Sequence, residues 1–184
     1  IFGILESYNS SYDSIMEMAQ NSMDAIDELN RMRIDDDEDE IEGIITTTID
    51  VNNNTIQIID NGAGMSTDTL AQFFRPNLSL KLRSRRHANS LRGYKGVGAT
   101  YLAYGFDSIH IATKHPTGTS SFRLRGGLDW VNDLTGEVEK PTAIPYEEDD
   151  ETFAALERGT LVRIRLNQNT SPTSVNNLGG NNRS

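Results

Sequence analysis

Residues 43–65 read GIITTTIDVNNNTIQIIDNGAGM, and this stretch decides the fold class. β-Branched residues dominate 44–51 and 55–59, which favours two strands because such side chains pack well on a pleated surface. The asparagines between the two runs tolerate the backbone angles of a turn. The stretch therefore predicts an antiparallel hairpin whose second strand leads directly into a glycine-containing loop.

A helix is expected before this hairpin, at residues 12–32, because apolar residues recur there every three or four positions. The same winding places Glu17, Asn21, Asp24 and Glu28 in one polar stripe. Such a stripe is most often the solvated face of an amphipathic helix. The alternative, that two carboxylates and an amide face a ligand, depends on the rest of the chain.

The rest of the chain mixes helices and strands. Helices are expected at 66–74, with Ser66 as the N-cap, and directly after the glycines of 93–98. Strands are expected at 108–113, 120–125 and 160–166. Because consecutive strands are close in sequence, the pattern predicts an α/β (α+β) fold, a two-layer sandwich with a mostly antiparallel sheet covered by helices.

Bulk composition narrows the function classes. The chain has 184 residues, a formal net charge of −10 and no cysteine. The charge argues against general binding to nucleic acid or anionic membranes, and the lack of cysteine excludes disulfides and thiolate metal sites. No apolar run approaches the roughly 20 residues that span a bilayer. We therefore expect a soluble, cytoplasmic protein that does not associate with membranes.

The two ends of the chain suggest a module of a longer protein. The sequence begins with isoleucine, and its last residues are rich in asparagine and glycine. We expect one domain at residues 1–170, followed by a flexible tail or the start of a linker at 171–184. Further domains of the same chain would then be its partners.

Charge is unevenly distributed. Acidic blocks at 35–40 and 147–151 are expected to be solvated loops. Residues 69–106, by contrast, contain basic residues and no carboxylate. The segment has three interpretations: a solvated basic loop, a contact with nucleic acid, or a lid that closes over a polyphosphate. Nucleic-acid contact lacks the usual interleaved aromatic residues, and the lid explains the segment best because it leads straight into the glycine loop.

Asp60 is the first candidate binding residue, because it places a charge where an apolar strand opens into a loop. Gly62 and Gly64 allow the backbone to approach a flat ligand closely. An ionised carboxylate only accepts hydrogen bonds, so it suits the exocyclic amino group of adenine and repels the oxygen of guanine. The alternative is an ordinary Asp-Asn-Gly turn.

A glycine loop is the second candidate. Gly93, Gly96 and Gly98 precede a predicted helix, so backbone N–H groups and the positive helix end meet at a potential phosphate site. The loop is not a P-loop, because Ala99 and Thr100 stand where that motif would end differently.

Four segments together resemble the boxes of the GHKL ATPases, which share the Bergerat fold. The segments, in order, are EMAQNSMDAID (17–27), IIDNGAGM (58–65), GYKGVGATYLAYGFDSIHIATKH (93–115) and GTLVRIRL (159–166). Their spacing is most similar to the N-terminal ATPase domain of the ninety-kilodalton heat-shock chaperones, and the family includes related gyrase and mismatch-repair ATPases. The resemblance covers 12–32, 44–114 and 159–167, and residues 115–158 resemble nothing in the family.

The resemblance implies a role for each matched residue. Glu17 matches the general base, Asn21 the Mg²⁺ ligand, Asp60 the adenine-reading carboxylate and Thr160 a hydroxyl that supports Asp60 through water. The other matched residues would shape the nucleotide pocket or contact the phosphates: Asp24, Ala25, Gly62, Gly64, Met65, Lys81, Gly93, Lys95, Gly96, Val97, Gly98 and Ala99. Lys95 departs from the chaperones, which usually carry an aromatic residue at that position.

The expected function is Mg²⁺-dependent ATP binding and hydrolysis. An ATP lid at about residues 66–98 would close over the nucleotide and drive a conformational or dimerisation switch, with a homodimer in the full-length protein. Alternatives are a nucleotide sensor with little turnover, a DNA-processing ATPase module that uses the basic lid on nucleic acid, and histidine-kinase-type phosphotransfer. Glu17 argues against phosphotransfer, because those kinases generally lack this base.

Overall fold

The structure is a computed structural model that describes residues 5, 8, 12–75 and 98–178. Its helices are α2 (Asp13–Asp35), α3 (Thr67–Phe73), α4 (Gly98–Tyr104), α5 (Gly127–Asn132), α6 (Glu151–Ala154) and the 3-10 helix η3 (Val175–Leu178). Its strands are β1 (Ile45–Asp50), β2 (Thr55–Asp60), β3 (Ser108–His115), β4 (Gly118–Arg125), β5 (Ile144–Pro145) and β6 (Gly159–Arg165).

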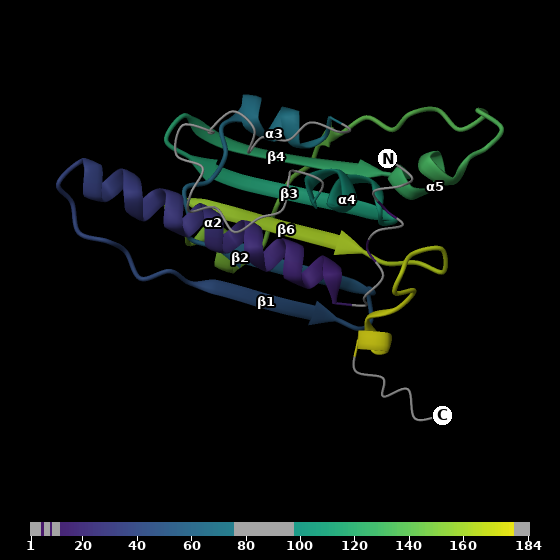
Figure 1. Cartoon of the computed structure of the whole chain (residues 1–184), viewed down its shortest axis with the longest axis horizontal. Coiled ribbons are helices and arrows are strands. Elements are labelled where there is room, and N and C mark those ends of the chain that lie inside the picture. The colour runs from purple at the N-terminus through teal and green to yellow at the C-terminus, as the bar shows by residue number, and fades with distance from the viewer. Residues whose placement is uncertain (1–4, 6–7, 9–11, 76–97, 179–184) are drawn as a thin grey trace.

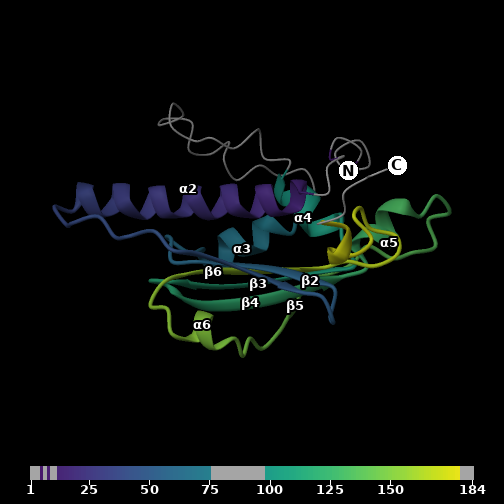
Figure 2. The same cartoon turned by 90° about the horizontal axis from the view of Figure 1, so that it is seen from below.

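The strands form one six-stranded antiparallel sheet in the order β1-β2-β6-β3-β4-β5 (Figure 1). Helices α2, α3 and α4 cover one face, which we call the helix face, and α6 lies on the opposite face (Figure 2). The predicted two-layer α+β sandwich is confirmed. The short α6 adds a partial third cover that the sequence did not indicate.

The main core lies between the sheet and the helix face. Met18 of α2, Ile58 of β2 and Leu102 of α4 are each about 1 % exposed and belong to one apolar cluster. Burial of one such side chain contributes about 1.5–3 kcal/mol. A smaller cluster on the opposite face includes Leu161 of β6 and Phe153 of α6, so the sheet is buried on both sides near β6.

The β1–β2 hairpin forms where it was predicted, and local chemistry explains its turn. Asp50 accepts hydrogen bonds from the backbone N–H and side-chain amide of Asn53, at 3.0 and 2.7 Å. Asn54 adopts a positive φ of 55°, which asparagine tolerates better than most residues. The predicted N-cap of α3 also forms, since Ser66 Oγ accepts a hydrogen bond from Thr69 N at 3.2 Å.

The structure differs from the sequence prediction at the end of α2 and in the last segment described. Helix α2 continues to Asp35 rather than ending at residue 32, so it takes up the first residue of the acidic block. Beyond residue 170, where a flexible tail was expected, η3 buries Val175 and Leu178 in the main core. Asn54 Oδ1 accepts a hydrogen bond from Val175 N at 2.9 Å, which ties this segment to the hairpin turn.

Candidate functional site

Asp60 lies at the end of β2, where the strand leaves the sheet beneath α2. The residue is 4 % exposed, and its carboxylate accepts hydrogen bonds from Ser22 Oγ at 3.0 Å and from Gly62 N at 2.9 Å. Thr160, opposite Asp60 in β6, supplies a further backbone hydrogen bond to the carboxylate. Three segments far apart in the sequence therefore hold one buried acid.

Burial raises the pKa of Asp60 to about 6, although its hydrogen bonds from Gly62, Ser22 and Thr160 lower it. The desolvation of the charged form outweighs the donors that stabilise it. At neutral pH the carboxylate is mostly ionised. A buried charge without hydrogen-bond donors around it costs free energy, so its oxygen atoms favour further donors. Such a group is suited to read a hydrogen-bond donor on a ligand.

The loop after Asp60 packs directly on α2. Ala63 N donates to Ala25 O at 3.0 Å, and a Cβ on Gly62 would lie 2.7 Å from the carbonyl carbon of Ala25. Only a glycine permits this approach. Gly64 has a φ of +68°, and a Cβ there would collide with Lys114 O. Both glycines are therefore in close contact with protein backbone, and their approach to a flat ligand stays a prediction.

A row of hydroxyls continues from Asp60 across the sheet. Thr160 pairs with Asp60 on one side and with Thr113 of β3 on the other. The Thr113 and Thr160 hydroxyl oxygens are 3.3 Å apart, and Thr113 Oγ1 accepts a hydrogen bond from Met65 N at 2.7 Å. Alternate residues of a strand share a face, and in this row the shared face is the helix face.

Ser22 and Thr113 were missed by sequence reasoning. Ser22 stands next to Asn21 in the first quoted box and is 3 % exposed, yet a lone serine in a helix carries no signal of its own. Thr113 could have been found only from the strand register, because 46 to 48 residues separate it from its partners Met65, Gly159 and Thr160.

Glu17 lies on α2 against the start of α4. A Cβ added to Gly98 would overlap the Glu17 carboxylate, so the first residue of α4 is in direct contact with this acid. Tyr8 donates a hydrogen bond from its hydroxyl to Glu17 Oε2 at 3.3 Å, and its ring stacks on Tyr101 at 3.8 Å between centroids. Burial and the charge of Glu17 together raise the pKa of Tyr8, which keeps its hydroxyl protonated as a donor.

The remaining polar residues of α2 divide between site and solvent. Asn21 is half-buried, as is the neighbouring apolar Ala25, and Glu28 is exposed as expected of a solvated position. Asp24 is 8 % exposed and accepts a hydrogen bond from Gln20 Nε2 at 2.9 Å. The polar stripe is thus not a uniformly solvated face.

Ala99 of α4 is half-buried beside Gly98. Five predicted phosphate contacts lie outside the described residues: Lys81, Gly93, Lys95, Gly96 and Val97. Most of the predicted lid lies outside them as well.

Glu17 and Asn21, one turn apart on α2, carry side-chain oxygen atoms, the donor type that Mg²⁺ prefers. Across residues 12–75 and 98–178, no group of three or more His, Asp or Glu side chains is arranged to hold a metal ion on its own. An ion bound to nucleotide phosphates would need few protein ligands, and the sequence prediction assigns one of them to Asn21.

A second polar centre lies on the opposite face of the sheet, under the segment of residues 144–156. Glu148, with a side chain 3 % exposed, lies 2.9 Å from His110 Nδ1 and 3.3 Å from Arg163 Nη2. The predicted acidic loop at 147–151 is therefore not wholly solvated: Glu148 points into the protein, and Asp150 caps α6 by accepting from Phe153 N at 3.0 Å. Burial and the neighbouring Arg163 lower the pKa of His110 to about 4, so this imidazole is neutral at physiological pH.

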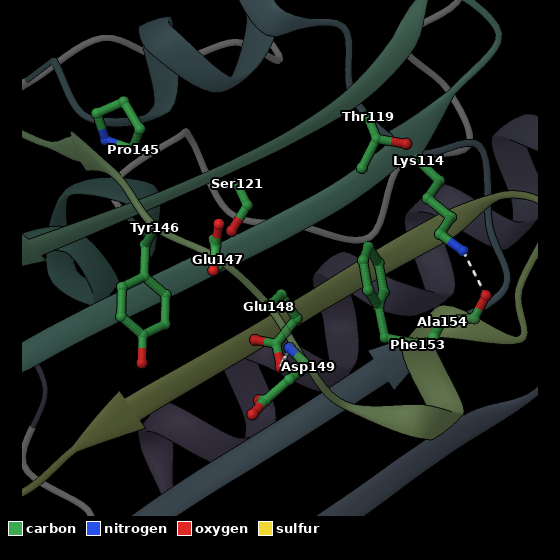
Figure 3. Close-up of a pocket in the computed structure, with 10 residues that line it drawn as sticks. All are labelled: Lys114, Thr119, Ser121, Pro145, Tyr146, Glu147, Glu148, Asp149, Phe153 and Ala154. Carbon is green, nitrogen blue, oxygen red and sulfur yellow. Dashed lines mark hydrogen bonds between the residues drawn. The ribbon is translucent and has the colours of Figure 1, made fainter.

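A hollow of about 650 Å³ adjoins this centre (Figure 3). Tyr146, Glu148 and Phe153 line it, and Lys114 Nζ donates to Ala154 O at its edge at 2.7 Å. The hollow contains none of the residues predicted to bind nucleotide. It lies on the opposite side of the sheet from Asp60.

No protein-family model matches the chain, and no curated protein is significantly similar to it. In the described part of the chain, no helix is both long enough and apolar enough to cross a membrane.

Proposed function

We propose that the chain binds ATP with Mg²⁺ on the helix face of the sheet and hydrolyses it. The observation that carries this proposal is Asp60, a buried carboxylate held by Ser22 and Gly62 at the point where β2 opens into its glycine loop. The resemblance of the four sequence boxes to the GHKL ATPases is the reason for proposing ATP as the substrate. ATP binding and hydrolysis would drive closure of the lid at about residues 66–98 and switch contacts within a larger protein.

Asp60 reads the adenine in this proposal. Its carboxylate accepts a hydrogen bond from the exocyclic amino group of adenine, and guanine would present an oxygen to the same charge. Thr160 and Thr113 supply hydroxyls in the adjacent row of the sheet, where they support an ordered water between base and protein. Selectivity for ATP over GTP follows from the sign of the charge.

Glu17 acts as the general base. It takes a proton from a water molecule whose oxygen attacks the γ-phosphorus, while the bond from that phosphorus to the β,γ-bridging oxygen breaks. Tyr8 orients the carboxylate through its hydrogen bond, and the contact with Gly98 places the acid at the start of α4. Asn21, one turn along α2 from Glu17, would hold the Mg²⁺ ion, which neutralises phosphate charge when it is bound.

The test is nucleotide binding and turnover by matched variants. Wild type is expected to bind Mg-ATP more tightly than Mg-GTP in calorimetry, and Asp60→Asn to lose at least about tenfold in ATP affinity because the amide presents a donor to a donor. Glu28→Gln is the control: it removes an exposed carboxylate from α2 and should change the affinity for neither ATP nor GTP.

Two outcomes would change the proposal. Wild type that binds neither ATP nor ADP at millimolar concentration contradicts it. Binding without phosphate release in the full-length protein would favour the nucleotide sensor instead.

A further inference from the structure

Strand β1 is an edge strand with an open outer side. It pairs with β2 on one side, and within the described residues no other strand pairs with it. Its residues are exposed except for Asp50, which is half-buried. Ile45 is 36 % and Ile49 is 47 % exposed, so the edge combines unpaired backbone groups with apolar side chains.

The strand register determines which backbone groups point outward. In an antiparallel ladder, alternate residues direct both their N–H and C=O groups to the same neighbour. Ile44 O accepts from Asn61 N, and Leu166 N donates to Asn54 O. Both bonds give the same parity: the even-numbered residues of β1 face β2, and Ile45, Thr47 and Ile49 direct their backbone groups away from the sheet.

The outward residues are self-complementary. Residues 45–49 read ITTTI, a palindrome centred on Thr47. If a second copy pairs antiparallel about Thr47, then Thr47 lies opposite Thr47 of the partner subunit and Ile45 lies opposite Ile49 of the partner subunit. Every outward N–H and C=O group in this stretch then meets an acceptor or a donor, and the isoleucines pair on the helix face.

Charge favours this register for two copies of an acidic chain. The strand has a single charged residue, Asp50, which in this arrangement lies opposite Ile44 of the partner subunit. The two Asp50 carboxylates lie at opposite ends of the pairing, about 20 Å apart at the usual rise of a strand. No like charges meet across the strands, although the net charge of each chain is −10.

We propose that β1 is a homodimer interface, in which two copies pair antiparallel about Thr47 and join their sheets into one. The interface is isologous, as a two-fold axis requires. A single pair of strands buries less than the roughly 800 Å² per partner of a standard interface. The isolated chain is therefore expected to dimerise weakly, with a dissociation constant in the micromolar range or above. This inference is independent of nucleotide binding.

Disulfide trapping tests the register. The chain has no native cysteine, so an introduced cysteine can form a disulfide only with the same cysteine of another copy. Thr47→Cys is expected to form a covalent dimer under mild oxidation, because directly opposite Cα atoms in a hydrogen-bonded pair are about 5.5 Å apart, within disulfide range. Thr48→Cys is the matched control. In the proposed pairing the two cysteines at position 48 are diagonal neighbours, about 7–8 Å apart or more. Equal trapping of both variants, or trapping of neither, would overturn the proposal.

Charge swapping tests the same contact without covalent chemistry. Thr47→Lys and Thr47→Glu should each weaken self-association about tenfold or more in sedimentation equilibrium, because like charges then lie directly opposite. An equimolar mixture of the two should restore dimers, an outcome that misfolding of either variant cannot produce. Wild type that stays monomeric at millimolar concentration, or single variants that associate like wild type, would refute the proposal and leave this edge to a different partner.

Discussion

Asp60→Asn is expected to stabilise the fold while it abolishes adenine recognition. The substitution keeps the shape of the side chain and removes its charge. Oδ1 can still accept from Gly62 N, and the new amide can donate to Ser22 Oγ, since a hydroxyl serves as donor or acceptor. The hydrogen bonds with Gly62 and Ser22 are retained, so the main change is the loss of a buried charge.

The magnitude follows from the pKa of Asp60, which rises from 3.8 to about 6 on burial. Each pKa unit corresponds to 1.36 kcal/mol, so the ionised carboxylate destabilises the folded state by up to about 3 kcal/mol above pH 6. Because the folded state binds the proton more tightly than the unfolded chain, wild-type stability from this group falls as pH rises from about 4 to 6. The asparagine variant lacks this loss.

Urea unfolding of both proteins at pH 8 and pH 4 measures the effect. At pH 8 Asp60→Asn should have a free energy of unfolding about 2–3 kcal/mol above wild type, and near pH 4 the difference should fall below about 1 kcal/mol. Glu28→Gln controls for the change in net charge and should follow wild type. A variant that is less stable than wild type at pH 8 would refute the reasoning, because the donors to the carboxylate would then outweigh its desolvation.

Three further predictions concern the base, the opposite face and the loop. Glu17→Gln should bind Mg-ATP like wild type but reduce turnover about 10²–10⁴-fold, and phosphate release at saturating ATP measures this. The pKa of His110 is about 4 in the folded state and 6.5 ordinarily, so the free energy of unfolding of wild type should fall by up to about 3 kcal/mol as pH falls from 6.5 to 4. His110→Gln should remove this dependence of the unfolding free energy on pH. An unchanged slope would contradict the assignment. Gly64→Ala should lower the melting temperature more than Gly126→Ala, because both have a φ near +70° but only the first Cβ meets backbone, Lys114 O; equal melting temperatures would show that the collision is relieved at no cost.

Local chemistry made several elements predictable from the sequence. The hairpin follows from β-branched runs around asparagines, and the cap of α3 follows from Ser66, since each depends on residues within a few positions. Asp60 stood out because a charge at the end of an apolar run is unusual. In the hairpin turn and the cap, the partners of a residue are its sequence neighbours, whereas Asp60 could be marked by its position but its partner Ser22 could not.

Features that depend on distant partners could not be predicted. Glu148 is one acid in an acidic run, and only its proximity to His110, 38 positions earlier, makes it a buried group. Val175 and Leu178 lie in a polar stretch that resembles a tail, and their burial depends on the turn at Asn54. Their roles follow from which segments the sheet order brings together.

Helix α2 carries residues that belong to two different tasks of the proposed site. Glu17, near its start, contacts Gly98 and would face the reacting end of a bound nucleotide. Ser22, little more than one turn later, holds Asp60, which would read the base. The N–H of Ala63 fastens the following loop to the same helix through Ala25 O. In the proposed site, base selectivity and catalytic rate therefore both depend on the position of α2. A substitution that rotates α2 to accept another base would also displace the attacking water. Engineering one property without the other would have to start from Thr113 or Thr160, which belong to the sheet.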